Sequence, residues 1–595
     1  MKNKLSILLQ RTNEKDSLQN AADNGRLLAM TPSAIDQCEE LGVEFLSPDD
    51  FISFKEYRDD VFAIYTETSS LCQRLDASVN PKIVDMRPYR SDTYSFWVLH
   101  ANMLYVHHLA ERLQDEFEDF SFIGVPELRP LAEAITPDLS EWYVVNCFGE
   151  GLPFVAMLLD HLLPVSDYVR EPAKISEPLL KAWQRFRPAL RYVKNKLIGL
   201  RKRCQSVTTA SVNILTSGVG YGIECLKEAV PEAHFILFDD VLPQMPPPGP
   251  PQLEPESLER EILSFSEKWL PRLSDILLAF FRNHHRSNIS TLPRLQELVG
   301  AVFDKTGPVA VFFTNGILGQ VWFSIAREAN KRGIPVVVTQ HGGLQLHKSP
   351  PGFCNETPDT IESIWVYQGA LDEERFPGAR RFRGGNIPAW RIAARPLELP
   401  NDALYLHGGN SFSFYGAMAC SDLTRHRSII EVIRVFGNHK APLTFKTHVV
   451  DSDYNKRYFK GLISRLGQGT EKVLFGGYAE AILHRYGLIV IENVNSLTSI
   501  LALGLDRPVI LHTPNDCLIR DDIRSALMDR VYYSTNEKEL AGFVERFKAG
   551  DLPVKGLKRA RENFMWPTEG PDPVLRTAGF LRSLIEGDVD FDNKD

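Results

Sequence analysis

The sequence contains few cysteines, and none of them are spaced as a disulfide or metal motif. Eight cysteines are spread over 595 residues, and no two of them form a CxxC pair. This spacing argues against a disulfide framework, a zinc ribbon and an iron-sulfur site. We therefore expect a protein of the reducing cytoplasm that holds no metal.

The sequence also lacks the long apolar run that a membrane helix needs. Its longest apolar windows, PFVAMLLDHLLPV and YGLIVIENVNSLTSILALGL, are interrupted by acidic or amide residues. A spanning helix needs about 20 consecutive apolar residues, so we expect no transmembrane segment. The start, MKNKLSILLQRTNEK, has an apolar run too short for a signal peptide, and we interpret it as a first strand.

An excess of positive charge is absent as well. The chain has 67 Lys and Arg against 76 Asp and Glu, a formal net charge of -9. Such a chain has no global attraction for nucleic acid, so an anionic partner must be met by a local basic patch. Residues 181–203 form such a patch, rich in Lys and Arg and free of acids. We interpret it as a basic amphipathic helix that contacts anionic lipid or glycan, or as a solvated basic face packed on the protein.

Short apolar runs that alternate with helical spacing predict an α/β protein. From residue 209 onward the alternation is regular, and the apolar runs end in glycine, small polar residues or acids. Such ends are typical of the carboxyl edge of a parallel sheet that meets a ligand. We predict two doubly wound Rossmann-like domains that face a cleft, with extra helical segments in the N-terminal half.

The predicted domains are an acceptor-side domain, a donor-binding domain and a C-terminal helical segment, over residues 1–397, 398–555 and 556–595. The C-terminal helix could pack back on the first domain. Two helical stretches are predicted across 256–305, and the basic segment ARRFRGGNIPAWRIAARPLELP is interpreted as the connector between the domains.

Two consecutive predicted strands of the first domain end in polar residues and glycines. They are VAVFF, followed by TNG, and VVVT, followed by QHGG. Because both strands belong to one βαβ unit, we expect their ends to lie side by side. His341 is a candidate catalytic base, although it could merely hydrogen-bond a loop. The acceptor-side candidates are Thr314, Asn315, Gln340, Gly342 and Gly343.

The strand ends of the second domain carry candidates for a nucleotide site. The glycine pair after ALYL would let backbone N–H groups approach a phosphate, although a plain turn is the commoner reason for such a pair. LIVI ends at Glu492, which could bind a ribose or base, and a Ser/Thr-rich helix start follows that could bind a phosphate or cap the helix. The donor-binding candidates are His407, Gly408, Gly409, Asn410, Glu492, Asn493, Ser496, Thr498 and Ser499.

The strand LTFK is followed by threonine and histidine. Residues two apart on a strand point to one face, so Lys446 and His448 could project together and neutralise a phosphate. The alternative is a solvent-facing edge. A further glycine-rich segment, TSGVGYG over 216–222, is interpreted as a structural turn or acceptor-side loop rather than a dinucleotide site.

Three of these segments together resemble a known superfamily. GIPVVVTQHGG, FKTH and ENVNSLTSILALGLDRPVI are similar to the capsule-polysaccharide biosynthesis and CDP-glycerol glycerophosphotransferase superfamily, which includes the Kdo transferases. The similarity covers mainly residues 310–515, and Val449 stands where the family usually has proline. The resemblance implies the GT-B fold and a cytidine-linked donor, first CMP. It implies that His341 lies near the reacting centre. It also implies that the donor phosphate is surrounded by Lys446, His448, Ser496 and Thr498.

These features predict a metal-independent glycosyltransferase that uses no cofactor. It would transfer a Kdo-like sugar from a nucleotide donor to a bacterial surface polysaccharide or a lipid-linked glycan, with His341, Lys446 and His448 as catalytic residues. We expect a cytoplasmic protein, with peripheral association at the inner membrane through residues 181–203 left open. The alternatives are a glycerophosphotransferase-like polymer enzyme, a nucleotide-sugar 2-epimerase and a non-catalytic glycan-binding partner.

Overall fold

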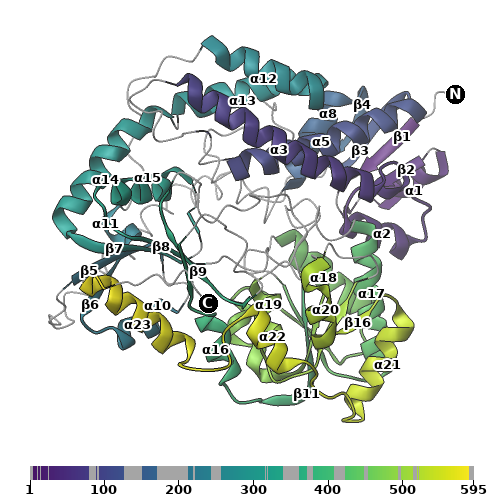
Figure 1. The fold of residues 1–595 in the computed structure, drawn as a ribbon. Helices are drawn as coiled ribbons and strands as arrows, with labels where there is room; N and C mark the ends of the chain where they lie inside the picture. Colours follow the sequence, from purple (N-terminus) through teal and green to yellow (C-terminus); the bar gives the residue numbers. More distant parts are fainter. Residues whose placement is uncertain are drawn as a thin grey trace.

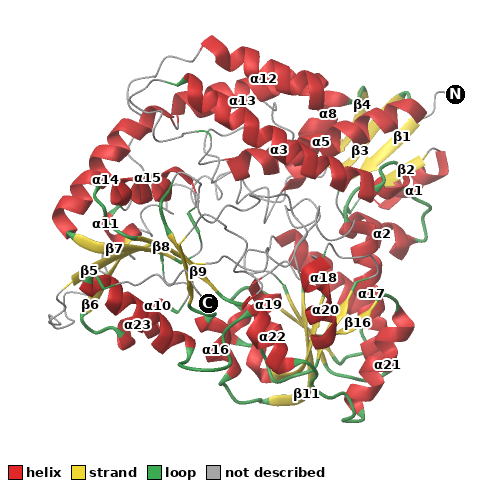
Figure 2. Ribbon diagram, in the orientation of Figure 1, coloured by secondary structure: helices red, strands yellow, loops and turns green. Residues whose placement is uncertain are grey.

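The described residues of the computed structural model form three parallel sheets with helices between and around them (Figure 1). The described residues are 4–9, 11–13, 15–24, 26–79, 89, 93–125, 151–170, 212–218, 222–242, 256–287, 289–314, 316, 317, 319–339, 361–370, 380–407, 422–447, 453–492, 497–513, 519 and 521–588. Figure 2 shows helices flanking the strands of the sheets. Within these residues no helix is both long and apolar enough to cross a membrane.

The first sheet has four parallel strands in the order β2-β1-β3-β4. Its strands are β1 (Lys4–Leu8), β2 (Arg26–Ala29), β3 (Asp119–Val125) and β4 (Val165–Arg170). Its helices are α1 (Lys15–Asn24), α2 (Pro32–Leu41), α3 (Phe54–Ser78), α5 (Thr93–Glu116) and α8 (Gly151–Leu162). β1 is buried on both faces, because Ile7 packs into one core and Leu8 into another.

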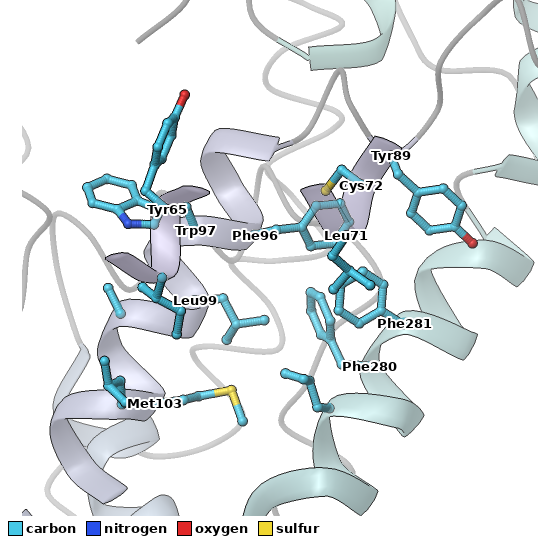
Figure 3. Close-up of a cluster of buried hydrophobic side chains, with 14 of the residues drawn as sticks. Tyr65, Leu71, Cys72, Tyr89, Phe96, Trp97, Leu99, Met103, Phe280 and Phe281 are labelled. Atoms are coloured by element: carbon cyan, nitrogen blue, oxygen red, sulfur yellow. The ribbon is translucent and has the colours of Figure 1, made fainter. Parts of the chain in front are cut away.

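A layer of helices joins this first sheet to the second. The predicted pair of helical stretches over 256–305 is in fact three helices, because 3-10 turns that contain Pro271 and Ile289 interrupt it. The helices are α12 (Glu256–Trp269), α13 (Ser274–Ser287) and α14 (Leu292–Thr306). Figure 3 shows where α5 meets α13: the Phe96 and Phe281 rings stack with their centroids 4.7 Å apart. Such aromatic pairs contribute about 0.5–1.5 kcal/mol beyond their buried area.

The second sheet has six parallel strands in the order β10-β9-β8-β7-β5-β6. Its strands are β5 (Val212–Thr216), β6 (Ala233–Leu237), β7 (Pro308–Phe313), β8 (Val336–Thr339), β9 (Ile364–Tyr367) and β10 (Arg380–Arg383). Its other helices are α10 (Ile223–Ala229), α11 (Phe238–Val241) and α15 (Gly319–Lys331). The strand order reverses between β5 and β7. The first hydrophobic core runs without a break from the first sheet through the helical layer to this sheet.

The third sheet also has six parallel strands, in the order β13-β12-β11-β14-β15-β16. Its strands are β11 (Leu399–Leu406), β12 (Leu443–Lys446), β13 (Glu471–Leu474), β14 (Tyr486–Ile491), β15 (Val509–His512) and β16 (Tyr532–Ser534). Its helices are α16 (Ile387–Ala393), α17 (Asp422–Asn438), α18 (Asp453–Leu466), α19 (Leu497–Leu503), α20 (Asp521–Arg530), α21 (Glu537–Lys548) and α22 (Leu557–Phe564). Numbered from its own first strand, the order is 3-2-1-4-5-6, which is the doubly wound order of nucleotide-binding sheets.

The last helix, α23 (Pro573–Glu586), returns to the second sheet and packs against α10. The Phe580 ring stacks on that of Phe382 in β10, with their centroids 4.2 Å apart. Gly385 has φ +83°, and a Cβ there would lie 2.8 Å from Trp566, so only glycine allows the segment before α23 to pass so closely.

The α/β class with two doubly wound parallel sheets is confirmed. Two details differ from the predictions. Residues 1–397, predicted to form one Rossmann-like domain, contain two separate sheets. The segment interpreted as a connector contains β10 and α16, which the pattern missed because the strand sequence RRFR is only half-buried and highly charged. The domain boundaries themselves stay a prediction.

Candidate functional site

The structure describes about a third of the predicted site residues. They are Thr314, His407, Lys446, Glu492, Thr498 and Ser499. The predicted residues that lie outside the described ones are Asn315, Gln340, His341, Gly342, Gly343, Gly408, Gly409, Asn410, His448, Asn493 and Ser496.

The third sheet brings His407 and Glu492 together at the point where its strand order reverses. β11 and β14 are adjacent parallel strands, with Leu406 paired to Ile491, and each predicted residue comes directly after its strand. The connections leave β11 and β14 in opposite directions, toward β12 and β15. A doubly wound sheet binds its ligands at the carboxyl ends of the strands, at such a reversal.

The Glu492 carboxylate is surrounded by three polar side chains. The Tyr405 hydroxyl donates a hydrogen bond of 2.6 Å to Oε2. The Nδ1 of His407 lies 3.3 Å from the same oxygen, and Nε of Arg425 lies 3.6 Å from Oε1. All four side chains are buried. The cluster therefore holds an acid away from bulk water among hydrogen-bond donors.

The surroundings of Glu492 keep its carboxylate ionised. Burial alone would raise the pKa of Glu492, but the positive charges of His407 and Arg425 and the hydrogen bonds from His407 and Tyr405 lower it to about 2. A buried charge with a shifted pKa at a strand end is typical of a functional site. We call Tyr405, His407, Arg425 and Glu492 the carboxylate cluster.

Two members of the carboxylate cluster were not among the predicted residues. Tyr405 stands two residues before His407, so strand alternation places both on one face, and this signal was available in the sequence. Arg425 comes from α17, which packs on that face. Nothing in the local pattern of a helix indicates which strand-end acid its arginine will meet.

Lys446 lies next to His407 along the sheet edge, but its side chain points to the other face. The His407 N–H donates to the carbonyl oxygen of Lys446, at 3.2 Å. Lys446 pairs with Leu406, whose side chain belongs to the core on the opposite face from Tyr405. The ammonium group donates to the Thr447 carbonyl oxygen at 2.6 Å. β12 ends at Lys446, and His448 lies outside the described residues.

The second sheet also collects polar groups where its strand order reverses, between β5 and β7. The Ser217 hydroxyl after β5 accepts a hydrogen bond of 2.9 Å from the Thr314 N–H after β7. The two hydroxyls lie 3.2 Å apart, and the Thr339 hydroxyl at the end of β8 donates to the Thr314 carbonyl oxygen at 2.6 Å. Three strand ends are thereby joined by hydroxyl groups.

The glycine-rich segment 216–222 has a packing reason for its last glycine. Gly222 has φ +70°, and a Cβ there would lie 2.3 Å from Ile387 of α16. The close approach of the two helices α10 and α16 accounts for this glycine without a ligand.

Thr498 and Ser499 lie in the first turn of α19, the helix that follows β14, and Ser499 is buried.

Comparisons with known proteins are distant. No family model matches the sequence, and neither does any curated protein. Among solved structures, a UDP-GlcNAc 2-epimerase from Methanocaldococcus jannaschii has 14% identity and a TM-score of 0.39, over 62% of this chain and 99% of that one. MurG from Acinetobacter baumannii has 10% identity and a TM-score of 0.32, over 62% and 99%. A glycosyltransferase from Rickettsia africae has 12% identity and a TM-score of 0.35, over 63% and 98%. The fold of this chain is therefore established by its own sheets.

Proposed function

We propose that the chain is a glycosyltransferase of GT-B architecture that binds a nucleotide-linked sugar at the carboxylate cluster of the third sheet. The observation that supports this proposal most directly is the ionised Glu492 carboxylate at the strand-order reversal. Doubly wound sheets bind their ligands in this crevice, and an ionised acid there can accept hydrogen bonds from ribose hydroxyls.

The carboxylate cluster suits such a role because its charge is fixed before the ligand arrives. Arg425 and His407 hold the acid in its acceptor-only form. A neutral acid would present a hydroxyl that competes with the ribose hydroxyls as a donor. The glycines at 408 and 409 follow His407 directly and would receive the phosphates of the same nucleotide.

In this proposal the second sheet binds the acceptor, near the hydroxyl groups of Ser217 and Thr314. His341, which follows β8, would take the proton of the acceptor hydroxyl. Lys446, His448 and the start of α19 would compensate the charge on the departing phosphate. The resemblance of three sequence segments to capsule and Kdo transferases makes CMP-linked sugars the first donors to test and bacterial surface glycans the first acceptors.

Ligand-dependent unfolding tests the nucleotide site. The wild-type protein is heated with CMP, CDP, UDP, GDP and ADP in turn. A nucleotide at 100 times its Kd stabilises a protein by about 2.7 kcal/mol. We expect one base to raise the melting temperature of the wild type, and Glu492→Gln to abolish that rise.

Glu471→Gln is a matched control, because Glu471 is equally buried in the same sheet but lies at the start of β13 and binds backbone N–H groups. This variant should keep the nucleotide response. A wild type that no nucleotide stabilises, or a Glu492→Gln variant with unchanged response, contradicts the proposal.

The reaction is identified with donor and acceptor together. Free nucleotide that is released only when a glycan acceptor is present indicates a transferase. An isomerised donor without acceptor indicates an epimerase, and tight binding without either product indicates a glycan- or nucleotide-binding protein.

A further inference from the structure

The first sheet contacts the third sheet through helix α2, which packs against α17 and α18. Nε2 of His426 in α17 lies 3.1 Å from Oε2 of Glu39 in α2. Arg465 of α18 forms an ion pair with Asp36, also in α2, and Arg11 after β1 pairs with the same acid at 3.0 Å. The two sheets are therefore joined by charged side chains and not only by apolar packing.

His426 has a fixed orientation at this contact. Its side chain is fully buried. The hydrogen bond from His426 lowers the pKa of Glu39, so the carboxylate is ionised and can only accept. Nε2 therefore carries the proton that it donates to Glu39. Nδ1 lies 2.8 Å from the Tyr458 hydroxyl of α18, so one imidazole links helices α2, α17 and α18.

The neighbours of these two residues belong to the carboxylate cluster and its packing. Arg425, next to His426, is the arginine that faces Glu492. Phe459, next to Tyr458, packs edge-on against the His407 ring, with the centroids 4.9 Å apart. In both α17 and α18, adjacent residues thus face the first sheet and the nucleotide site.

The first turn of α17 makes a second contact with the first sheet and α2. Leu423 packs against the core between β1, β2 and α2. Arg425 and His426 are covalent neighbours in one hydrogen-bonded helix, so a displacement of the His426 backbone also displaces that of Arg425. The Nε of Arg425 already lies 3.6 Å from Oε1 of Glu492, so a displacement away from the acid would weaken this ion pair.

We propose that the first sheet and α2 position the nucleotide site, with Glu39 acting through His426 and Tyr458 to place Arg425 and Phe459 against Glu492 and His407. Glu39, His426 and Tyr458 are positioning residues in this account and do not touch the ligand. The proposal deepens the proposed function, because it takes the carboxylate cluster as the nucleotide site.

Glu39→Gln and Glu40→Gln are a matched pair for the test. Both acids lie in α2 and have similar side-chain exposure, 33% and 34%, but Glu40 pairs with Arg11 instead of His426. With the nucleotide that stabilises the wild type, titration calorimetry should give a Kd about 5- to 10-fold higher for Glu39→Gln, a range typical of coupling between distant sites. Glu40→Gln should stay within about 2-fold of the wild type, the scatter of independent surface changes.

A double-mutant cycle separates positioning from general loosening. Tyr458→Phe removes only the hydroxyl that contacts His426, and should raise the Kd by a similar factor. Because both residues act through one imidazole, Glu39→Gln with Tyr458→Phe should raise the Kd little more than the larger single change. Single effects that multiply in the double variant, or an unchanged Kd for Glu39→Gln, overturn the proposal.

A second measurement needs no nucleotide and so separates this proposal from the proposed function. With histidines labelled at 13Cε1, and His407→Asn to assign the signal, the His407 resonance should shift in Glu39→Gln and not in Glu40→Gln. If no nucleotide binds but this pattern appears, the coupling holds and the proposed function fails. An unshifted His407 resonance in Glu39→Gln refutes the coupling.

Discussion

Two buried polar clusters differ in the charge state of their side chains, since one is kept neutral and the other is kept ionised. Where α5 packs against the helical layer, burial lowers the pKa of His100 to about 3, and burial together with His285 lowers that of His284 to about 3. The partner of His100 is a neutral hydroxyl, that of Thr68, at 2.7 Å. In the third sheet, the carboxylate cluster instead holds Glu492 ionised, with a pKa of about 2.

The difference separates a structural core from the proposed nucleotide site. Burial disfavours charge on His100 and His284, and His100 packs among aromatic rings such as Phe281 and Phe265. The carboxylate cluster retains charge, although a buried ion pair is often no more stabilising than apolar residues of the same volume. Under the proposed function, Glu492 and Arg425 are retained because the ligand needs a fixed charge.

Both clusters lose stability in acid, but over different pH ranges. His100 and His284 have folded pKa values below the ordinary value of 6.5, so the unfolded chain binds more protons between pH 6.5 and 3. Their contribution is complete above pH 6.5 and falls as the pH is lowered. The contribution of Glu492 is complete above its ordinary value of 4.5 and is lost only as the pH falls toward 2.

The largest effect is expected from removing the arginine of the carboxylate cluster. Arg425→Gln leaves the Glu492 carboxylate buried without its guanidinium, which typically costs about 3–5 kcal/mol. Denaturant unfolding at pH 7 should show the loss as a lower midpoint. Arg427→Gln, an exposed arginine two residues along α17, is the control and should change the midpoint little. Equal midpoints for the two variants would show that the cluster does not depend on charge pairing.

A smaller loss is expected for Tyr405→Phe. The variant removes the 2.6 Å hydrogen bond to an ionised acceptor, and such bonds contribute about 1.5–3 kcal/mol. Unfolding at pH 7 measures the loss. Tyr486→Phe, at the opposite end of β14 and equally buried, is the control and should change stability less. A Tyr405→Phe protein as stable as the wild type would mean that Glu492 is not held by this hydroxyl.

The buried neutral histidines are tested by the slope of stability against pH. Each histidine kept neutral by the fold removes up to about 1.4 kcal/mol per pH unit of acidification below 6.5. His100→Phe should therefore lose less stability between pH 6.5 and 5 than the wild type. His234→Gln, an exposed histidine in β6, should keep the wild-type slope. If His100→Phe keeps it too, His100 is not a neutral buried group.

The smallest effect is expected for another histidine–acid contact of the third sheet, next to the carboxylate cluster. Nε2 of His512 at the end of β15 lies 3.5 Å from Oε2 of Glu431, which is 28% exposed. A long pair with a partly solvated acid contributes about 0–1 kcal/mol. Glu431→Gln should therefore change the unfolding midpoint at pH 7 by less than Tyr405→Phe does. A larger change would place Glu431 among the residues that retain charge.

Much of the secondary structure follows from sequence pattern. The runs VVVT and YGLIVI are wholly buried strands, because parallel strands bury both faces and need continuous apolar residues. The sequence pattern did not predict β10, because RRFR lies at the edge of its sheet and is only half-buried. The sequence pattern also did not predict that the first sheet is separate. Its strands are far apart in the chain, with α3 and α5 between β2 and β3.

The candidate site likewise has one part that the sequence predicts and one part that only the tertiary structure decides. His407 and Glu492 were recognisable, since a polar residue that ends a buried strand must lie at the sheet edge, and local pattern reveals that edge. Their meeting depended on the strand order, which places β11 beside β14 across 85 residues of chain. Arg425 and His426 acquire their partners from different sheets although they are neighbours in sequence. Local pattern is encoded by residues within a few positions, whereas such contacts arise only when distant segments pack against one another.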